Sequence, residues 1–195
     1  MKSMRFFFVA VSLVCLGGAL QSFAQAQAKS LAQTQTPIQA EGQHQYTPFM
    51  VGIATPLQVP PRDFDVGGLR LGVIYSECRD FDGLDLGGVG HAKGHGNGLQ
   101  IEVLANIVDG DGMGLQFACV NYVKGEYSGL QAGVANYCEK GKALQLGFYN
   151  GANYIEGLQI GVINTTQRMI GMQIGAVNVI QDNDAPFMPI INCYF

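Results

Sequence analysis

Two histidines and three aspartates between residues 80 and 95 are the side chains best suited to hold a metal ion. His91 and His95 follow Asp80, Asp82 and Asp85 closely in the chain. Imidazole nitrogens and carboxylate oxygens are ordinary ligands of divalent metals. The segment is rich in glycine, however, and such turns commonly expose polar residues without binding anything. We therefore expect solvated loop residues here and no metal site.

Two glycine-containing segments have the form of partial ligand-binding loops. The alternating carboxylates of Asp109 and Asp111 resemble part of a calcium loop, but the bidentate Glu of a full loop is missing, so a tight turn is expected. The run from Gly87 to Gly90 does not open a helix, which a phosphate-binding loop requires. Neither segment predicts a cofactor.

Paired carboxylates are the third kind of chemistry that the sequence could carry, as in β-helix enzymes that act on polysaccharides. Asp109, Asp111, Glu126 and Glu139 fall in neighbouring turns, but they do not share one position in those turns. Acid and base catalysis needs a positioned pair with shifted pKa values. No such pair and no nucleophile motif stands out, so no catalytic residue is predicted.

The elements that position these residues are copies of one motif, Gly-Leu-Gln-x-Gly-x-x-Asn. About eight copies begin 14 to 16 residues apart, at Gly68, Gly83, Gly98, Gly114, Gly129, Ala143, Gly157 and Gly171. Gln stands two places after the start of the last six copies, where the first two copies have Arg70 and Asp85. Self-similarity at a fixed period is the signature of a repeat architecture. We therefore expect an all-β repeat protein without helices.

The alternation of residue types within each copy predicts a half-buried strand. In the copy that begins at Gly157, Leu158, Ile160 and Val162 alternate with Gln and Gly. In a strand, alternate residues lie on opposite faces, which gives a period of two. This pattern predicts that Leu158, Ile160 and Val162 face the core, with the Asn on the same face and the Gln opposite. Leu158→Asp should then destabilise the protein severely.

A parallel β-solenoid is the favoured arrangement of these strands. Each coil of a solenoid repeats the path of the previous coil, so identical amide side chains stack and can hydrogen-bond. The alternative is an eight-stranded antiparallel meander or outer-membrane β-barrel, which the number of copies and the terminal Phe195 would suit. In a barrel five Asn side chains would approach lipid, where unpaired polar groups are costly.

The N-terminal part of the chain has the features of an exported protein. Residues 1–24 combine Lys2 and Arg5 with an apolar run, as a cleaved signal peptide does; Ala26 is a second cleavage point. Residues 25–45 are a Gln- and Ala-rich spacer expected to be disordered, 46–65 are a lead-in or cap, and 66–195 are the repeat domain. Without Lys2 and Arg5, nine basic residues remain against fifteen acidic ones, which argues against nucleic acid or anionic lipid as a partner. No transmembrane helix is predicted.

Four cysteines remain after the signal peptide, in a compartment that permits disulfides. They are Cys78, Cys119, Cys138 and Cys193, and they allow three pairings among which the sequence does not choose. Cys119 takes an apolar position that the strand pattern places inside. We expect a free, buried thiol there.

The copies from Gly129 to Asn136 and from Gly157 to Asn164 resemble the repeats of uncharacterised exported bacterial surface-repeat proteins. The similarity covers about Val66 to Ile180, and the tail from Ala185 to Asn192 resembles the ends of such proteins. It implies no catalytic, cofactor or metal residue. We therefore expect a non-enzymatic structural or interaction protein of the envelope or surface of a Gram-negative-type bacterium, with an envelope component meeting its Gln and Asn face. A small outer-membrane β-barrel and a carbohydrate-active β-helix enzyme are the alternatives.

Overall fold

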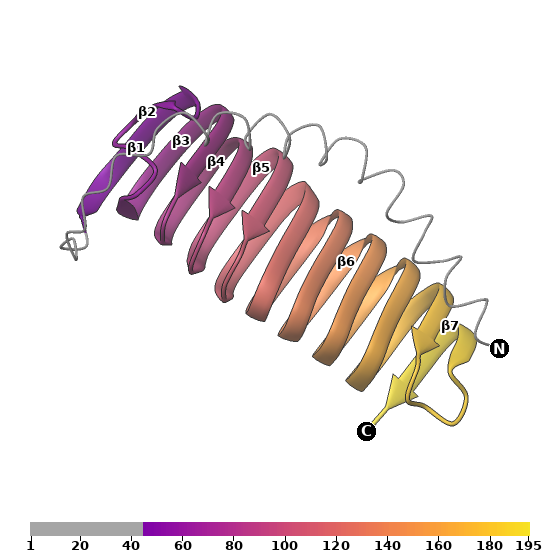
Figure 1. Cartoon of the computed structure of the whole chain (residues 1–195). Coiled ribbons are helices and arrows are strands. Elements are labelled where there is room, and N and C mark those ends of the chain that lie inside the picture. The colour runs from indigo at the N-terminus through magenta and orange to yellow at the C-terminus, as the bar shows by residue number, and fades with distance from the viewer. Residues whose placement is uncertain (1–44) are drawn as a thin grey trace, which may run out of the picture. The chain divides into compact units, whose positions relative to one another are not determined.

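The structure, a computed structural model, describes residues 45–195, and this part of the chain is a parallel β-solenoid (Figure 1). Its strands form one sheet in the order β2-β1-β3-β4-β5-β6-β7. None of the described residues is helical. The strands are β1 (Tyr46–Ala54), β2 (Leu57–Val59), β3 (Asp65–Cys78), β4 (Phe81–Ala92), β5 (Gly96–Val108), β6 (Gly112–Ile180) and β7 (Phe187–Tyr194). The expected signal peptide and nearly all of the expected spacer lie outside the described residues.

Identical positions of successive copies lie side by side, as a solenoid requires. Leu69 of β3 pairs with Leu84 of β4, and Leu99 of β5 pairs with Leu115 of β6, all in parallel register. The prediction of a parallel solenoid is therefore confirmed, and the antiparallel meander is not observed. Five separate strands, β1, β3, β4, β5 and β6, pair in parallel. This is slightly fewer than the eight copies expected, because β6 continues through several copies without a break.

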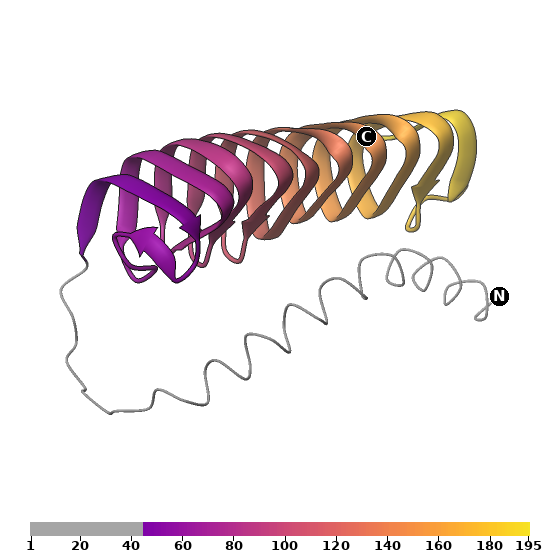
Figure 2. The same ribbon diagram turned by 90° about the horizontal axis from the view of Figure 1, so that it is seen from above.

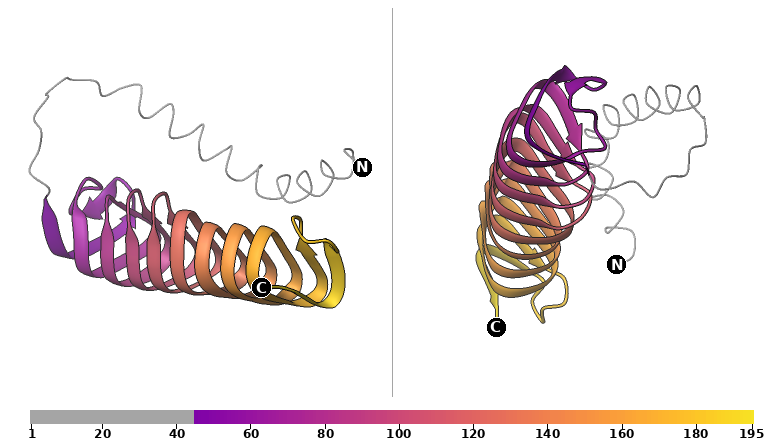
Figure 3. Two further views of the ribbon diagram at one scale, coloured as in Figure 1. Left: turned by 90° about the horizontal axis from the view of Figure 1, so that it is seen from below. Right: turned by 90° about the vertical axis from the view of Figure 1, so that its left-hand side faces the viewer.

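Each coil turns a corner shortly after the second glycine of its motif. The register between β4 and β5 shifts between Gly87 and Val89, and the other parallel pairs shift near the same place. Val103 and Leu104, consecutive in the chain, are 71% and 56% exposed, so both point outward at this corner. Figure 3 shows the coils end-on as flattened loops. The corner explains why a simple alternation of faces does not hold through a whole copy.

Two columns of amide side chains run through the interior. The Gln column consists of Gln100, Gln116, Gln131, Gln145, Gln159 and Gln173, each at most 1% exposed. The Asn column consists of Asn106, Asn121, Asn136, Asn150, Asn164 and Asn178, also at most 1% exposed. Each amide is hydrogen-bonded to the same residue of a neighbouring coil. Pairing of this kind removes the penalty of burying polar groups.

The predicted inner face is therefore wrong. Ile160 and Val162 are 38% and 43% exposed, whereas Gln159, which precedes Ile160 in the chain, is fully buried. The Asn residues do not share a face with Leu158, because the corner of the coil lies between them. Buried amides are tolerated because each finds a partner one coil away, which the alternation of apolar and polar residues along a single strand does not reveal.

Apolar side chains complete the core on both sides of the amide columns. One column precedes the motif and includes Val66, Phe81, Tyr127, Ile155 and Met169. The other follows the Asn column and consists of Cys78, Ala92, Val108, Val123, Cys138, Ala152 and Ile180. The interior is thus polar along its middle and apolar toward one edge of the flattened coil.

Short strands cover the two ends of the stack (Figure 2). At the N-terminal end β1 pairs with β3 in parallel, and β2 folds back on β1 in antiparallel orientation. At the C-terminal end β7 pairs antiparallel with the last part of β6. Folded-back edges of this kind protect a sheet from pairing with other chains.

Candidate functional site

The most extensive surface feature of the solenoid is a line of exposed apolar side chains along the corner of the coils. We call this surface the apolar ridge and define it by the residues five places after the start of each copy. Its exposed members are Val73, Val103, Cys119, Val134, Phe148 and Val162. Val73, Val103, Val134 and Phe148 are each more than half exposed. A soluble monomer rarely exposes a continuous apolar surface of this extent, so the ridge is a candidate contact surface.

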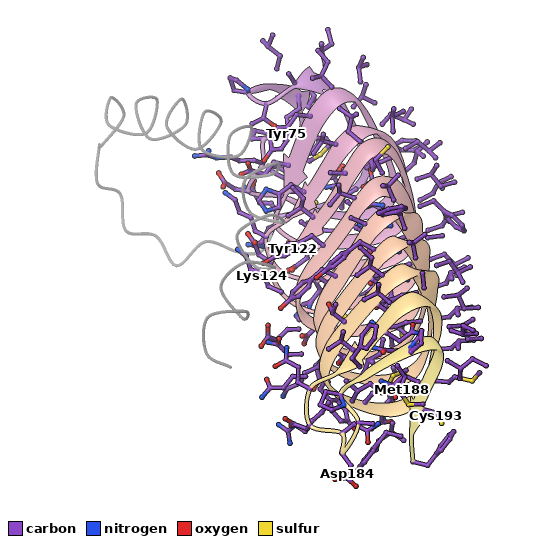
Figure 4. The ribbon with its side chains drawn as sticks, turned by 90° about the vertical axis from the view of Figure 1, so that its right-hand side faces the viewer. Tyr75, Tyr122, Lys124, Asp184, Met188 and Cys193 are labelled. Atoms are coloured by element: carbon purple, nitrogen blue, oxygen red, sulfur yellow. The ribbon has the colours of Figure 1, made fainter. Side chains whose placement is uncertain are left out.

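The strand walls beside the ridge are also free of outward-facing charge. The outward positions lie one, three, five and six places after each start, and all of them carry apolar residues, tyrosine or glycine. The charged residues between the start of a copy and its Asn position, Arg70, Asp85 and Glu102, are buried instead. Figure 4 shows carbon-rich side chains gathered along one edge of the ribbon and nitrogen- and oxygen-bearing ones along the other.

The opposite edge of the solenoid carries the charged residues. Ion pairs there join neighbouring coils, with 3.4 Å between Lys142 Nζ and Glu156 Oε2 and 3.5 Å between Arg168 Nε and Asp182 Oδ2. Exposed pairs of this kind each contribute less than about 1 kcal/mol to stability. The cross-section of the solenoid is therefore amphipathic, with an apolar edge and a charged edge.

A hydrogen-bonded row crosses the turns of β3, β4 and β5 on the charged side, where Tyr75 and Lys124 lie (Figure 4). Tyr75 Oη lies 2.9 Å from His91 Nδ1, and His91 Nε2 lies 2.9 Å from Asp109 Oδ2. Lys124 also pairs with Asp109. Burial alone would raise the pKa of Asp109, but hydrogen bonds from Lys124 and His91 outweigh it and lower that pKa.

The row has the residue types of a proton relay, but its polar atoms are already engaged with one another. Tyr75 Oη donates to Glu77 Oε2 at 2.9 Å, so this hydroxyl has a carboxylate acceptor as well as the imidazole. Lys93 pairs with Glu77 from the next coil. The row therefore links successive coils, and its geometry accounts for these residues as structural ion pairs.

A buried charge cluster occupies the N-terminal end of the Gln column. Arg70 Nε donates to Asp85 Oδ1 at 2.7 Å, and both side chains are fully buried. Arg70 also lies 4.8 Å from the centre of the Phe81 ring. Burial alone would lower the pKa of Arg70, but the charge of Asp85 more than compensates and raises it. The arginine and the aspartate thus continue the column as an ion pair.

Glu102 is the third acidic or basic residue of this buried cluster. It stands where most other copies have their second glycine, is 4% exposed, and neither carboxyl oxygen has a hydrogen-bond partner among the described residues. A Cβ on Gly90 would lie within 3 Å of Asp85 Oδ2 and Glu102 Oε1, so this glycine leaves space for both carboxyls. Burial and the charge of Asp85 raise the pKa of Glu102 to about 9. Glu102 is therefore neutral at physiological pH.

The residues considered for a metal site are not brought together. Asp85 is buried with Arg70, Asp82 accepts a hydrogen bond from Asn97, and Asp80 accepts one from the backbone of His95. Within residues 45–195 no three His, Cys, Asp or Glu side chains are placed to hold a metal ion.

The four carboxylates considered for catalysis are used in contacts between coils. Asp111 Oδ1 accepts a hydrogen bond from the backbone N–H of Glu126 at 2.8 Å, as expected for a turn residue. Glu139 accepts hydrogen bonds from Tyr137 and Asn153. Asp109 pairs with His91, a contact between two motifs that sequence reasoning treated separately.

All four cysteines of the described part are free thiols. Cys78 and Cys138 are buried, and burial raises the pKa of their thiols to about 11 and about 12. Cys119 is exposed on the apolar ridge, so the prediction that it is buried is wrong. The error follows from the wrong inner face, because Cys119 stands at a ridge position.

A cavity of about 200 Å³ lies at the C-terminal end of the solenoid. Tyr154, Met169, Ile180 and Tyr194 line it, together with the exposed pair of Arg168 and Asp182. It lies far along the stack from the row of Tyr75 and Lys124, as the labels in Figure 4 show for the neighbouring Cys193 and Asp184. The cavity and the row therefore do not form one site.

The apolar ridge is the feature that sequence reasoning missed, although a signal for it was present. In five of the six copies that have both residues, the Asn follows the Gln after five steps, which is an odd number. Two residues that far apart lie on opposite faces of a straight strand. Both can be inside only if the chain bends between them, and that bend turns the apolar residues outward.

No helix among residues 45–195 is long and apolar enough to cross a membrane. Comparison of the chain with protein-family models, curated proteins and solved structures finds no match.

Proposed function

We propose that this chain is a non-enzymatic structural or interaction protein of the bacterial cell envelope or surface, and that the apolar ridge is its contact surface. The observation that carries the proposal is the ridge itself, which presents the same kind of side chain in nearly every coil. A repeated surface of this kind suits an extended contact. It does not suit the binding of one small molecule, which needs a few convergent polar groups in a concave site.

The surface that makes the contact differs from the one first expected. The Gln and Asn side chains are buried and hydrogen-bonded to one another, so they are not accessible to a partner. The accessible repeated surface is apolar, and it supports contact with an apolar partner.

The expected export of the chain and its resemblance to surface-repeat proteins support a place in the envelope. Fractionation of cells that express the full chain tests this proposal. We expect the protein in the envelope fraction, and we expect Val134→Glu to shift it into the soluble periplasmic or external fraction.

Met113→Glu is the matched control for this experiment. Met113 and Val134 are 60% and 58% exposed, but Met113 shares its place in the motif with the polar residues Asp82, Asn97, Ser128, Lys142 and Glu156. Met113→Glu should leave the protein in the envelope. Recovery of the unmodified chain in the cytoplasm, or equal behaviour of the two variants, would contradict the proposal.

A further inference from the structure

We infer that the partner of the apolar ridge is a lipid bilayer, into whose outer acyl-chain region the ridge inserts while the charged edge stays in water. This inference rests on the proposed function and names the partner of the same surface. Three properties of the solenoid carry it: its satisfied backbone, its separation of charge from the ridge, and the convex shape of the corner.

The backbone of the coils has its hydrogen bonds within the protein. The strands on either side of the ridge pair with the next coil in parallel register, and the amide columns pair inside. Unpaired N–H and C=O groups are the main obstacle to placing a sheet against hydrocarbon, because lipid offers them no partner. The strand walls beside the ridge therefore present apolar side chains to lipid without a row of unpaired backbone groups, while the register is interrupted at the corner itself, as between Gly87 and Val89.

Charge is absent from the outward positions around the ridge and concentrated at the opposite edge, as described above. Two half-buried tyrosines, Tyr122 and Tyr137, lie on the wall between these edges and stack with ring centroids 5.3 Å apart. Tyrosine is enriched where apolar and aqueous layers meet at a membrane. This order of apolar, tyrosine and charged residues is that of an element lying in a membrane interface.

The shape of the ridge distinguishes lipid from a second copy of this chain. Two consecutive residues, such as Val103 and Leu104, both point outward, so the surface is a convex corner. Face-to-face packing of sheets needs two flat faces that interdigitate. Two convex corners would touch along a narrow line, whereas fluid acyl chains can surround one.

The position of the charged residues also predicts which lipids the ridge should bind. The charged edge is directed away from the ridge, so binding should come from apolar burial and need no anionic lipid. Binding to neutral vesicles of phosphatidylcholine should therefore change little between low and high salt, unlike binding through surface charges.

A fluorescent probe on Cys119 tests the inference in the full chain. Cys119 lies on the ridge and is exposed, and Cys78 and Cys138 are buried, so changing Cys15 and Cys193 to Ser leaves one accessible thiol. The labelled protein is mixed with phosphatidylcholine vesicles that carry a quencher on their acyl chains. We expect a blue shift and quenching of the probe at Cys119.

The matched probe is placed on the polar side of the same coil by Met113→Cys combined with Cys119→Ser. It should show neither the shift nor the quenching. Because the two proteins share the same N-terminal segment, binding of that segment to lipid cannot produce the difference. The comparison also needs no destabilising substitution.

Charge placed on the ridge gives the second measurement. With the probe at Cys119, Val134→Glu should weaken binding to the vesicles about tenfold or more, because a charged side chain is expelled from hydrocarbon. Met113→Glu should change binding less than about twofold by the same reasoning. Circular dichroism should show the same β content in both variants.

Two results would overturn the inference. One is that the probes at Cys119 and at Met113→Cys are quenched equally, or that neither probe is quenched. The other is a concentration-dependent dimer in sedimentation that Val134→Glu abolishes, with no quenching by lipid, which would assign the ridge to a second copy. If Val134→Glu released the protein from the cell envelope but vesicles caused no quenching, the proposed function would stand and the lipid inference would fail.

Discussion

Gln145 Nε2 donates a 2.8 Å hydrogen bond to Oε1 of Gln131, the residue at the same place one coil earlier. Every Gln of the column after Gln100 donates in this direction, toward the N-terminus. The Asn column donates in the opposite direction, as Asn136 Nδ2 does to Asn150 Oδ1 at 2.8 Å. A second bond from Asn136 Nδ2 to the backbone oxygen of Leu146 in the following coil fixes that orientation. The dipoles of the two columns are therefore opposed along the solenoid.

Replacement of one Gln in the middle of the column should destabilise the protein strongly. Gln145→Ala removes the donor to Gln131 Oε1 and the acceptor of Gln159 Nε2. Each buried polar atom left without a partner costs about 1–3 kcal/mol, so we expect the free energy of unfolding to fall by about 2–5 kcal/mol. Urea unfolding followed by circular dichroism measures this change.

Gln167→Ala provides the control for that experiment. Gln167 is exposed, and exposed substitutions usually change stability by less than about 0.5 kcal/mol. A loss at Gln145 no larger than at Gln167 would show that the amide column contributes little to stability.

The first glycine of the motif should tolerate no side chain where its φ is positive, whereas Ala143, at the same place in another copy, does not have a positive φ. Gly157 has a φ of +144°, and a Cβ there would lie 2.2 Å from the backbone oxygen of Ala143 in the preceding coil. Gly157→Ala should lower the free energy of unfolding by about 2 kcal/mol or more, because it combines backbone strain with a clash between coils. The shift of the thermal unfolding midpoint reports the loss.

Gly151→Ala is the matched glycine control. A Cβ at Gly151 would meet the Tyr149 hydroxyl at 3.0 Å, which is the far end of a flexible side chain. We expect a clearly smaller loss than at Gly157. Equal losses would mean that close backbone approach is not what selects glycine at the start of the motif.

Glu102 should make stability fall as the pH rises. Its pKa is about 9 in the folded protein, against about 4.5 for a free Glu side chain. Between these pH values the folded state holds a proton that the unfolded state has lost. The contribution of Glu102 to stability is therefore fully present below about pH 4.5 and declines toward pH 9, by at most about 1.4 kcal/mol per pH unit.

Glu102→Gln removes this titration while keeping the shape of the side chain. Urea unfolding at pH 5, 7 and 8.5 should show a flatter dependence in the variant, and the variant should be the more stable of the two at pH 8.5. An unchanged slope would place the buried proton on another group.

The cysteines should react in two classes. Cys119 and Cys193 are exposed, whereas Cys78 and Cys138 are buried with raised thiol pKa values. Brief treatment of the native protein with iodoacetamide should modify Cys119 and Cys193 and leave Cys78 and Cys138 unmodified until urea is added. Peptide mass spectrometry identifies the modified residues, and early modification of Cys138 would contradict the solenoid core.

The sequence alone determined that the chain is a β-repeat, and it favoured coils that stack in parallel. The reason is physical: stacked amides such as Gln131 and Gln145 can hydrogen-bond only when identical positions of successive coils are neighbours. The sequence also showed where glycine begins each copy, since Gly157 and its equivalents recur with the spacing of the coils.

Only the tertiary structure decided which side of each strand is the inside. A strand has two faces, and the usual preference for buried apolar residues selected the face of Leu158 and Ile160. The bend after the second glycine and the partners found one coil away reversed that choice, because a buried Gln that is fully hydrogen-bonded carries little penalty. The same reversal turned Val134 and Cys119 outward. The apolar ridge is thus a consequence of satisfying amides between coils, a relationship that no single copy of the motif contains.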